Sequence, residues 1–438
     1  MNCSCSSFHG GGAAIFYIPY GTGTVPLDIP DTQPYDVVNY RMNENDGDES
    51  VSLTRIRDTL NRPYGTPPLR ELARGKKHAV IMISDGTRLC PSHIILPLLL
   101  DELNQGGVHD DAITILIALG MHRQHTPQEM ERLVGARVYT RVRVLNHSAA
   151  AEDCIYLGTT SAGTPVEINR IAVEADLRIV TGNIEPHAMA GVSGGVKAII
   201  PGIASERCIQ HNHSLSMNGR TVPGETDNPV HRDMAEALRF INIDFMLNVI
   251  VNHKQHILEA VAGHVVQAHR TAIDKAAARF IVPSQTDYDV TVVSPGGHPK
   301  DMQMYQSIKA LRNASAITKP GGTILMAAEC AEMMGNGTLS LWVETMRDRK
   351  RAVDKLKQQF QLGAHKLLHL DDVLSRHTVY LHSSIPRPIV ELLGFIPAEN
   401  LQSAFHLALT NKAVKLAVMP FGSLTYPQVL QKPQSPPK

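Results

Sequence analysis

The sequence has no excess of charge of either sign. Lys plus Arg and Asp plus Glu each number 42 in 438 residues, so the formal net charge is zero. A protein that binds nucleic acid or an anionic membrane surface through charge needs a basic excess. We therefore expect neither a nucleic acid nor a membrane among its partners.

Cysteine is also sparse, and no long apolar run is present. The six cysteines are scattered, and only Cys3 and Cys5 are close together. Such spacing gives no disulfide or zinc framework and fits a reducing compartment. No basic segment followed by a long apolar run opens the chain, and no stretch approaches the length of a membrane span. We expect a cytoplasmic protein.

What the sequence does contain is a regular alternation of apolar runs of strand length with helical patterns. This alternation predicts an α/β protein built as two Rossmann-like domains around parallel sheets, with an active-site cleft between them. We expect strands at residues 78–83, 112–119, 141–146, 175–181, 289–294, 323–328 and 412–419, a hairpin of 245–252 with 256–261, and a helix at 265–280.

A change of pattern near Pro283 suggests the domain boundary. We expect residues 1–283 to form an N-terminal, cofactor-binding domain that is completed by residues 408–430. Residues 284–407 would form a C-terminal domain on the substrate side. The Pro-rich tail 431–438 is expected to be disordered.

Polar clusters follow several of the predicted strands directly. They are Asp85-Gly86-Thr87-Arg88, Gly120-Met121-His122-Arg123, Glu185-Pro186-His187 and Gly296-Gly297-His298-Pro299. Ligands of open α/β sheets bind at the carboxyl ends of the strands. These clusters are therefore the candidate site.

The densest group of polar and glycine residues lies between Gly182 and Ser214. Gly191, Gly194 and Gly195 would let backbone amides form a nest for an anion, and Lys197 follows directly. On spacing alone, an ordinary strand-to-helix turn with a solvated lysine is at least as good an interpretation.

As a set, these motifs resemble the nickel-dependent lactate racemase family. The resemblance also takes in Ser193-Gly194-Gly195-x-Lys197, Pro201-Gly202-Ile203, Asn212-His213-Ser214, Tyr156-Leu157-Gly158-Thr159-Thr160 and Tyr305-Gln306-x-x-Lys309, in the order of the family. It covers roughly residues 15–420. It implies a racemase or epimerase of a lactate-like 2-hydroxy acid, an isomerase that moves the C2 hydride reversibly to a cofactor.

The cofactor implied by the resemblance is a nickel-pincer nucleotide. This is a pyridinium mononucleotide with two sulfur-containing arms, joined to a lysine, which holds Ni(II) through both sulfurs and a ring carbon. By position the lysine is Lys197 and the histidine ligand is His213, with His211 as the competing ligand. Imidazole and soft sulfur donors suit planar Ni(II).

The resemblance assigns the acid/base pair to His122 and His187, one on each face of the reacting carbon. Imidazole, with a pKa near ~6.5, can accept and return a proton at neutral pH. From its local sequence alone, His122 could equally be a helix-capping or supporting residue.

The anionic groups are expected to meet cationic and polar side chains. Asp85, Thr87 and Arg88, with Gly194 and Gly195, are expected to hold the nucleotide, and Arg88 also to touch substrate. Tyr305, Gln306 and Lys309 would bind substrate from the second domain, although an exposed helix face is the alternative for an isolated Gln-x-x-Lys.

Several histidines outside these motifs receive no role. His253, His256, His264 and His269 are interpreted as surface positions. His298 stands where the family pattern often has an aromatic residue, which leaves the identity of the substrate open.

Three alternatives to a lactate-like racemase stay open. The first is an epimerase of a longer or sugar acid with the same cofactor. The second is a His-metal hydrolase or lyase without a nucleotide, although the chain has no His-Glu-x-x-His signature. The third is a binding protein without catalysis. The expected partners are a small hydroxy acid and the enzymes that build the cofactor.

Overall fold

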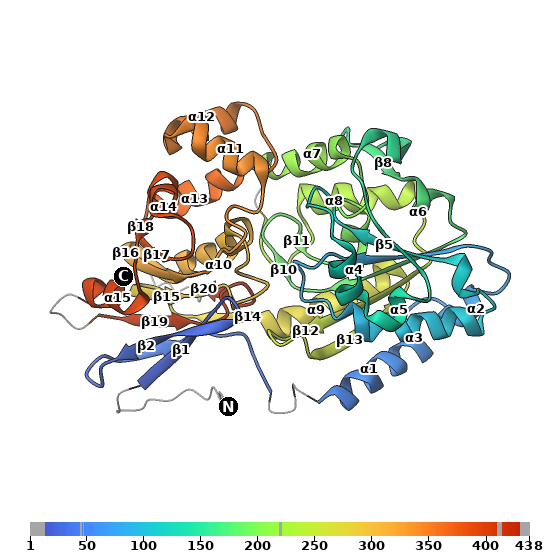
Figure 1. Cartoon of the computed structure of the whole chain (residues 1–438), viewed down its shortest axis with the longest axis horizontal. Coiled ribbons are helices and arrows are strands. Elements are labelled where there is room, and N and C mark those ends of the chain that lie inside the picture. Colours follow the sequence, from blue (N-terminus) through green and yellow to red (C-terminus); the bar gives the residue numbers. More distant parts are fainter. Residues whose placement is uncertain (1–13, 44–45, 47, 219–220, 410–413, 430–438) are drawn as a thin grey trace, which may run out of the picture. The chain divides into compact units, whose positions relative to one another are not determined.

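The computed structural model describes residues 14–43, 46, 48–218, 221–409 and 414–429, and the chain divides into two compact units. Unit 1 combines the N-terminal segment up to Arg41 with the chain from Phe280 onward, and unit 2 is Met42–Arg279. Both units contain a six-stranded sheet with helices (Figure 1). This confirms the predicted α/β class with parallel sheets.

Unit 2 is built on a sheet with the strand order β13-β12-β9-β4-β5-β6, in which only β13 is antiparallel. Its strands and helices are β4 (Ala79–Ser84), β5 (Ile113–Ala118), β6 (Arg143–Asn146), β7 (Cys154–Thr159), β8 (Pro165–Asn169), β9 (Leu177–Asn183), β10 (Pro186–His187), β11 (Gly191–Val192), β12 (Phe245–Val251), β13 (Ile257–Gly263), α1 (Glu49–Asn61), α2 (Leu69–Leu72), α3 (Ser92–Gln105), α4 (Pro127–Val134), α5 (Ala136–Tyr139), α6 (Arg170–Glu174), α7 (Glu206–Ser214), α8 (Pro229–Glu236), α9 (Val265–Phe280) and the short 3₁₀ turns η1 (Asp110–Ala112), η2 (Ala151–Asp153), η3 (Gly195–Ala198), η4 (Leu215–Asn218) and η5 (Ala237–Arg239).

The central strands of unit 2 are continuous apolar runs because both faces of the sheet are covered. Five of the six residues in β4 and in β5 are buried, as expected of parallel strands with helices on both sides. The N-cap residue of α4 is Thr126. Its side chain accepts from the Glu129 amide, and the Glu129 side chain accepts from the Thr126 amide, which is a capping box.

Unit 1 has an all-parallel sheet with the order β18-β17-β16-β15-β19-β3. Its elements are β1 (Ala14–Tyr20), β2 (Gly23–Ile29), β3 (Tyr35–Val37), β14 (Ile281–Ser284), β15 (Tyr288–Val293), β16 (Thr318–Ala327), β17 (Thr378–His382), β18 (Ile396–Pro397), β19 (Leu416–Met419), β20 (Tyr426–Val429), α10 (Met304–Ile317), α11 (Gly337–Met346), α12 (Arg349–Gln358), α13 (Lys366–Leu374), α14 (Arg387–Leu393) and α15 (Leu401–Ala408).

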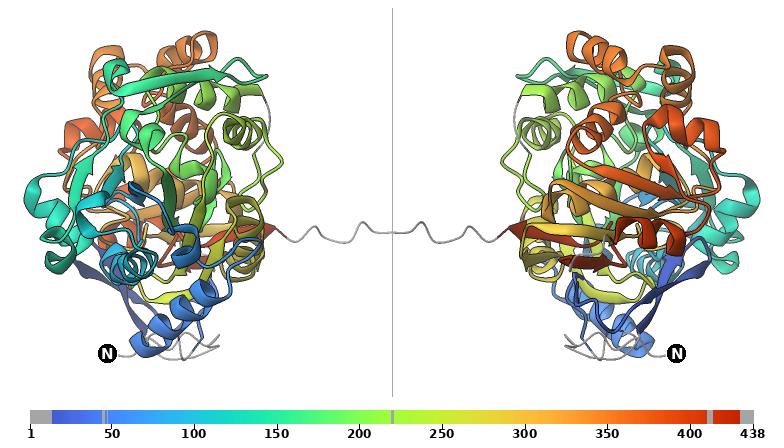
Figure 2. Two further views of the ribbon diagram at one scale, coloured as in Figure 1. Left: turned by 90° about the vertical axis from the view of Figure 1, so that its right-hand side faces the viewer. Right: turned by 90° about the vertical axis from the view of Figure 1, so that its left-hand side faces the viewer.

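Two apolar clusters line the two faces of the sheet in unit 1. Along β16, Ile324 and Met326 belong to one cluster and Leu325 and Ala327 to the other, because side chains alternate across a strand. The first cluster contains residues of α10 to α14. The second contains α15 and the hairpin of β1 with β2, drawn dark blue in Figures 1 and 2.

The observed division of the chain differs from the predicted domains at two places. The predicted strand at 412–419 corresponds to β19, but β19 pairs with β15 and β3 in unit 1 and does not complete the first domain. The described N-terminal residues 14–41 also belong to unit 1. The boundary lies near the predicted one, at Phe280, and the tail 431–438 lies outside the described residues.

Within the described part of the chain, no helix is long and apolar enough to cross a membrane.

Candidate active site

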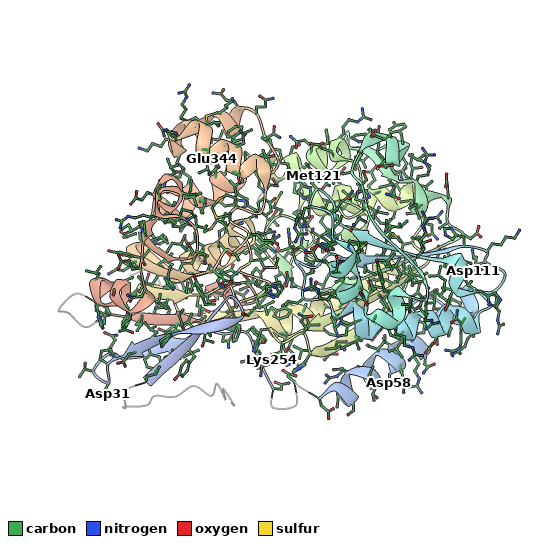
Figure 3. All side chains as sticks on the ribbon, in the orientation of Figure 1. Asp31, Asp58, Asp111, Met121, Lys254 and Glu344 are labelled. Carbon is green, nitrogen blue, oxygen red and sulfur yellow. The ribbon has the colours of Figure 1, made fainter. Side chains whose placement is uncertain are left out.

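The predicted polar clusters of unit 2 share one edge of its sheet. Strands β9, β4 and β5 are parallel neighbours. Glu185 and His187 follow β9, Asp85 and Arg88 follow β4, and His122 follows β5. Figure 3 labels both ends of β5, with Asp111 just before the strand and Met121, the neighbour of His122, just after it. The site therefore lies at the carboxyl ends of parallel strands, the usual ligand edge of such sheets.

At this edge the buried Asp85 pairs with His122, whose side chain is 25% exposed. The His122 Nδ1 atom lies 3.0 Å from Asp85 Oδ2, and the carboxylate is only 4% exposed. Burial by itself raises the pKa of Asp85. The charge and hydrogen bond of His122, together with Arg88 and Thr87, outweigh burial and hold this pKa far below its usual range. The carboxylate is therefore ionised, and His122 Nδ1–H donates to it.

Asp85 also has partners within its own loop. Its other carboxylate oxygen accepts from the amide and the hydroxyl of Thr87, at 2.7 and 2.5 Å. Of the three residues predicted to bind the nucleotide phosphate in this loop, only Arg88 brings a positive charge.

His187 is fixed by the turn that follows it. The amides of Met189 and Ala190 both donate to His187 Nδ1, each at 3.2 Å. The turn closes because β10 and β11 pair, with His187 opposite Gly191. Because Nδ1 accepts both bonds, the proton of the neutral ring is on Nε2.

The glycine-rich loop is packed tightly against its surroundings. Gly194 and Gly195 have φ of +76° and +54°, a region that favours glycine. A Cβ on Gly194 would lie 2.2 Å from Ile184 Cδ1, and a Cβ on Gly195 would lie 2.7 Å from the ring of His269. The Gly195 amide donates to Asn248 Oδ1 at 2.8 Å, so it is not available to an anion.

His269, predicted to be a surface residue, is buried beneath this loop at 5% exposure. Burial lowers its pKa to about 4, so the ring is neutral at pH 7 and donates from Nε2 to the Ser193 carbonyl at 2.9 Å. Asn248 also donates to the Gly182 carbonyl at 3.2 Å. Neither residue can be identified from the sequence as a support of the loop, because nothing in their local sequence relates them to it.

Lys197 lies in η3, which packs against β9 and β4. Its side chain is partly buried. Burial, helped by the positive charge of Arg88, lowers the pKa of Lys197 to about 7, although Asp85 and Glu185 act in the opposite direction. None of the described hydrogen bonds or ion pairs involves its amine. A large fraction of this amine is therefore an uncharged nucleophile at neutral pH.

The two candidate metal histidines point to different sides of α7. His211 Nδ1 lies 2.9 Å from Thr164 Oγ1, in the turn between β7 and β8. His213 is two residues further, about 200° around the helix, and is 9% exposed. His211 is therefore directed at that turn, and His213 lies on another side of the helix.

A buried carboxylate, Asp233 of α8, joins two of the sequence motifs. It accepts from the hydroxyls of Thr160 and Thr164 at 2.5 and 2.7 Å, and from the Asn212 amide at 2.7 Å. The strand pair that carries Tyr156 to Thr160 is thereby tied to the helix that carries His213. Asp233 was not singled out from the sequence, where it is one acidic residue in a helix.

The predicted substrate residues lie in unit 1, on α10. Gln306 and Lys309 are 7% and 8% exposed, which excludes the exposed helix face that was the alternative. The Lys366 amine lies 4.7 Å from the centre of the Tyr305 ring, a cation–π contact. His365 and Lys366, which both lie against this ring, are also buried, and neither belongs to a motif identified in the sequence.

Comparison with known proteins supplies the family. Residues 20–223 match the family model "Lactate racemase N-terminal domain", and residues 283–423 match "Lactate racemase C-terminal domain". The chain belongs to the lactate racemase family. It is accordingly an isomerase, and the family predicted from the motifs is confirmed.

Relatives of this lactate racemase family member cover nearly the whole chain. The lactate racemase of Thermoanaerobacterium thermosaccharolyticum is 35% identical over 424 residues, which are 92% of this chain and 97% of that protein. The lactate racemase of Lactiplantibacillus plantarum is 32% identical over 384 residues, 84% of this chain and 89% of the relative.

Solved structures agree with the family assignment. The lactate racemase apoprotein of T. thermosaccharolyticum superposes with a TM-score of 0.84 at 33% identity, covering 95% of this chain and all of that one. A Thermotoga maritima protein has the same fold, with a TM-score of 0.66 at 17% identity over 89% of this chain.

The residues of this lactate racemase family member suit a cofactor that brings its own metal donors. Among the described residues, no three His, Cys, Asp or Glu side chains are placed to hold a metal ion together. A metal held by one histidine of the protein and by sulfur and carbon donors of a nucleotide would not need such a set of side chains. The nucleophilic Lys197 amine fits covalent attachment.

Proposed function

We propose that this enzyme racemises or epimerises a lactate-like 2-hydroxy acid with a nickel-pincer nucleotide attached to Lys197. The observation that carries the proposal is the environment of the Lys197 amine. It is partly buried, its pKa is lowered to about 7, and the charges of Arg88 and Asp85 act on it at the ligand edge of the sheet. When bound, the nucleotide would supply nickel and an acceptor for the C2 hydride.

The protein side chains have separate tasks in this proposal. His213 binds the nickel, and Arg88 binds a phosphate or a carboxylate with paired hydrogen bonds. His122, paired with Asp85, exchanges the proton of the substrate hydroxyl. His187, at the same edge, is the second histidine of the acid/base pair. Tyr305, Gln306 and Lys309 of unit 1 bind the substrate.

The motif matches also support the expectations about its partners and its compartment. We infer that enzymes that build the cofactor accompany this one, and that it works in the cytoplasm on a small hydroxy acid. An epimerase of a longer or sugar acid would use the same residues. A zinc hydrolase has less support, because catalytic zinc takes three protein ligands and the described residues offer no such set.

The test is intact-mass measurement of denatured protein made in a host that has the cofactor pathway. We expect an adduct on Lys197 that Lys197→Ala abolishes, while the surface control Lys254→Ala retains it. The loaded enzyme should interconvert the two lactate enantiomers. An adduct that survived in the Lys197→Ala protein would refute the attachment site.

A further inference from the structure

We propose that the preferred substrate is a 2-hydroxy acid with a second acidic group on its side chain, and that Arg312 and His369 of unit 1 bind this second group. The inference rests on the proposed function and narrows its substrate class to a dianion, whose second acid is a carboxylate or a phosphate. It follows from the basic side chains that lie between α10 and α13 beside the predicted substrate residues.

Arg312 continues the face of α10 that carries the predicted substrate residues. Tyr305, Lys309 and Arg312 are spaced by four and three residues, so they lie in one row along the helix. Helical side chains lean toward the N-terminus of their helix, which brings the Arg312 side chain toward the turn that carries Lys309. Helix α13 packs against α10 (Figure 1).

Helix α13 brings further basic side chains to this row. The Lys366 amine lies 4.7 Å from the centre of the Tyr305 ring, and Lys366 is only 6% exposed. His369 lies one turn further along α13. Burial, followed by the charges of Arg312 and Lys366, holds the pKa of His369 well below its usual range. The His369 ring is therefore neutral at pH 7, with two cations near it.

Arg312 and His369 both have hydrogen-bonding capacity that the protein does not use. Among the described residues, no hydrogen bond or ion pair involves the Arg312 guanidinium, although this side chain is half-buried. The carboxylate that acts on its charge is that of Asp372, whose Oδ2 atom is already paired with Arg376 at 3.0 Å. The Nδ1 atom of His369 is buried without a hydrogen-bond partner. Because buried polar groups are normally bonded, a ligand is the natural partner of this pair.

The ligand that fits this pair is an anionic oxygen group. A guanidinium binds a carboxylate or a phosphate with two parallel hydrogen bonds, and a neutral imidazole can donate one more. Arg312 is three residues beyond Lys309, which is roughly 4.5 Å of helix. A substrate whose first carboxylate is bound near Lys309 would therefore reach Arg312 with a second acid at its other end.

A substrate series for the loaded enzyme tests the proposal. Malate and 2-hydroxyglutarate carry a second carboxylate, 3-phosphoglycerate carries a phosphate, and lactate carries neither. Lactate should be converted, but kcat/KM for the preferred dianion should exceed that for lactate by about 10–100-fold, the value of a hydrogen bond to a charged group. The preferred dianion identifies the second acid as a carboxylate or a phosphate.

Substitutions test the two binding residues independently of protein stability. Arg312→Gln and His369→Leu should each lower the ratio of kcat/KM for the dianion to kcat/KM for lactate by about 10-fold or more, since each removes a donor. Loss of folded enzyme lowers both constants and cancels in this ratio. Arg312→Lys, which keeps the charge but not the paired donors, should lose less than Arg312→Gln. The control Arg351→Gln, at an exposed arginine of α12, should leave the ratio unchanged.

Two kinetic outcomes would overturn the proposal. One is a wild-type enzyme that prefers lactate to all three dianions. The other is a preference for a dianion that Arg312→Gln leaves intact.

Binding to the apo protein separates this proposal from the proposed function. A ligand raises the unfolding temperature according to its affinity. At equal concentration and ionic strength, the preferred dianion should raise this temperature more than lactate or inorganic phosphate does, and Arg312→Gln should abolish the difference. If this difference were present while loaded enzyme interconverted no hydroxy acid, the proposed function would fall and the anion site would stand. An equal effect of inorganic phosphate would mean a bare anion site and would overturn the substrate assignment.

Discussion

At the scale of single residues, one environment favours an uncharged lysine and a charged aspartate in the same site. Burial favours the uncharged form of any ionisable group. At Lys197 burial prevails, and Arg88 adds to it, so the amine loses its proton near neutrality. At Asp85 the same Arg88 and the adjacent His122 reverse the effect, and the carboxylate stays charged. The sequence placed these residues together, but their charge states depend on burial, which local sequence does not contain.

The lowered pKa of Lys197 predicts a reactive amine in the apo protein. At pH 7 about half of Lys197 should be neutral, against fewer than about one in a thousand molecules of a lysine with an ordinary pKa of ~10.4. Its labelling by a small acylating reagent, followed by peptide mass spectrometry, should rise with pH and level off above about pH 7. The exposed Lys254 should keep rising to about pH 10. Arg88→Gln should move the Lys197 midpoint upward, and an unchanged midpoint would contradict the assigned cause.

The choice of metal ligand is a second prediction at this scale. His213→Ala should remove most of the nickel from loaded enzyme, because it deletes the proposed protein donor. His211→Ala loses the contact with Thr164 in the β7–β8 turn and should retain most of the nickel. Metal content per adduct, measured by elemental analysis beside intact mass, checks this. Equal losses, or a larger loss in His211→Ala, would reverse the assignment.

At the scale of elements, the glycine loop shows what local patterns can and cannot predict. The pattern Gly-Gly-x-Lys predicted the location of this loop, at the carboxyl edge of the sheet. It did not predict the close packing around the glycines, because the groups that surround the loop come from distant parts of the chain. Asn248 is in β12 and His269 in α9, and both are recognised only after the sheet and its helices are assembled.

Two glycine substitutions separate backbone strain from crowding. Gly195 (φ +54°) and Gly75 (φ +74°) should both cost about 1–2 kcal/mol on replacement by Ala. A Cβ at Gly75 meets nothing within 4 Å, whereas at Gly195 it meets the His269 ring, which is held to Ser193. Gly195→Ala should therefore cost about 1–3 kcal/mol more. Thermal unfolding of the apo proteins checks this, and equal losses would mean that the ring moves aside.

At the scale of the whole molecule, the strands were predictable and their partners were not. An apolar run bounded by turns predicts a strand. It does not say which sheet the strand joins, because parallel neighbours are brought together by connections elsewhere in the chain. For that reason β19 was found but assigned to the wrong unit. The return of the N-terminal residues 14–41 to unit 1 was missed for the same reason.

The division of the chain leads to a prediction about separable functions. Every residue proposed to hold the cofactor, from Arg88 to His213, lies within the continuous segment 42–279, which has its own sheet and buried core. This segment, produced alone in a host with the cofactor pathway, should carry the Lys197 adduct. It should not racemise lactate, because Gln306 and Lys309 are in unit 1. Intact mass and a coupled assay for each enantiomer measure the two properties.

The matched controls for this experiment are the full chain and the same segment with Lys197→Ala. The full chain should show both the adduct and racemisation, and the Lys197→Ala segment should show neither. Circular dichroism of the segment establishes that it is folded before the adduct is sought. Racemisation by the segment at the rate of the full chain would contradict the role given to Tyr305, Gln306 and Lys309. A folded segment without the adduct would mean that attachment at Lys197 needs groups from unit 1 as well.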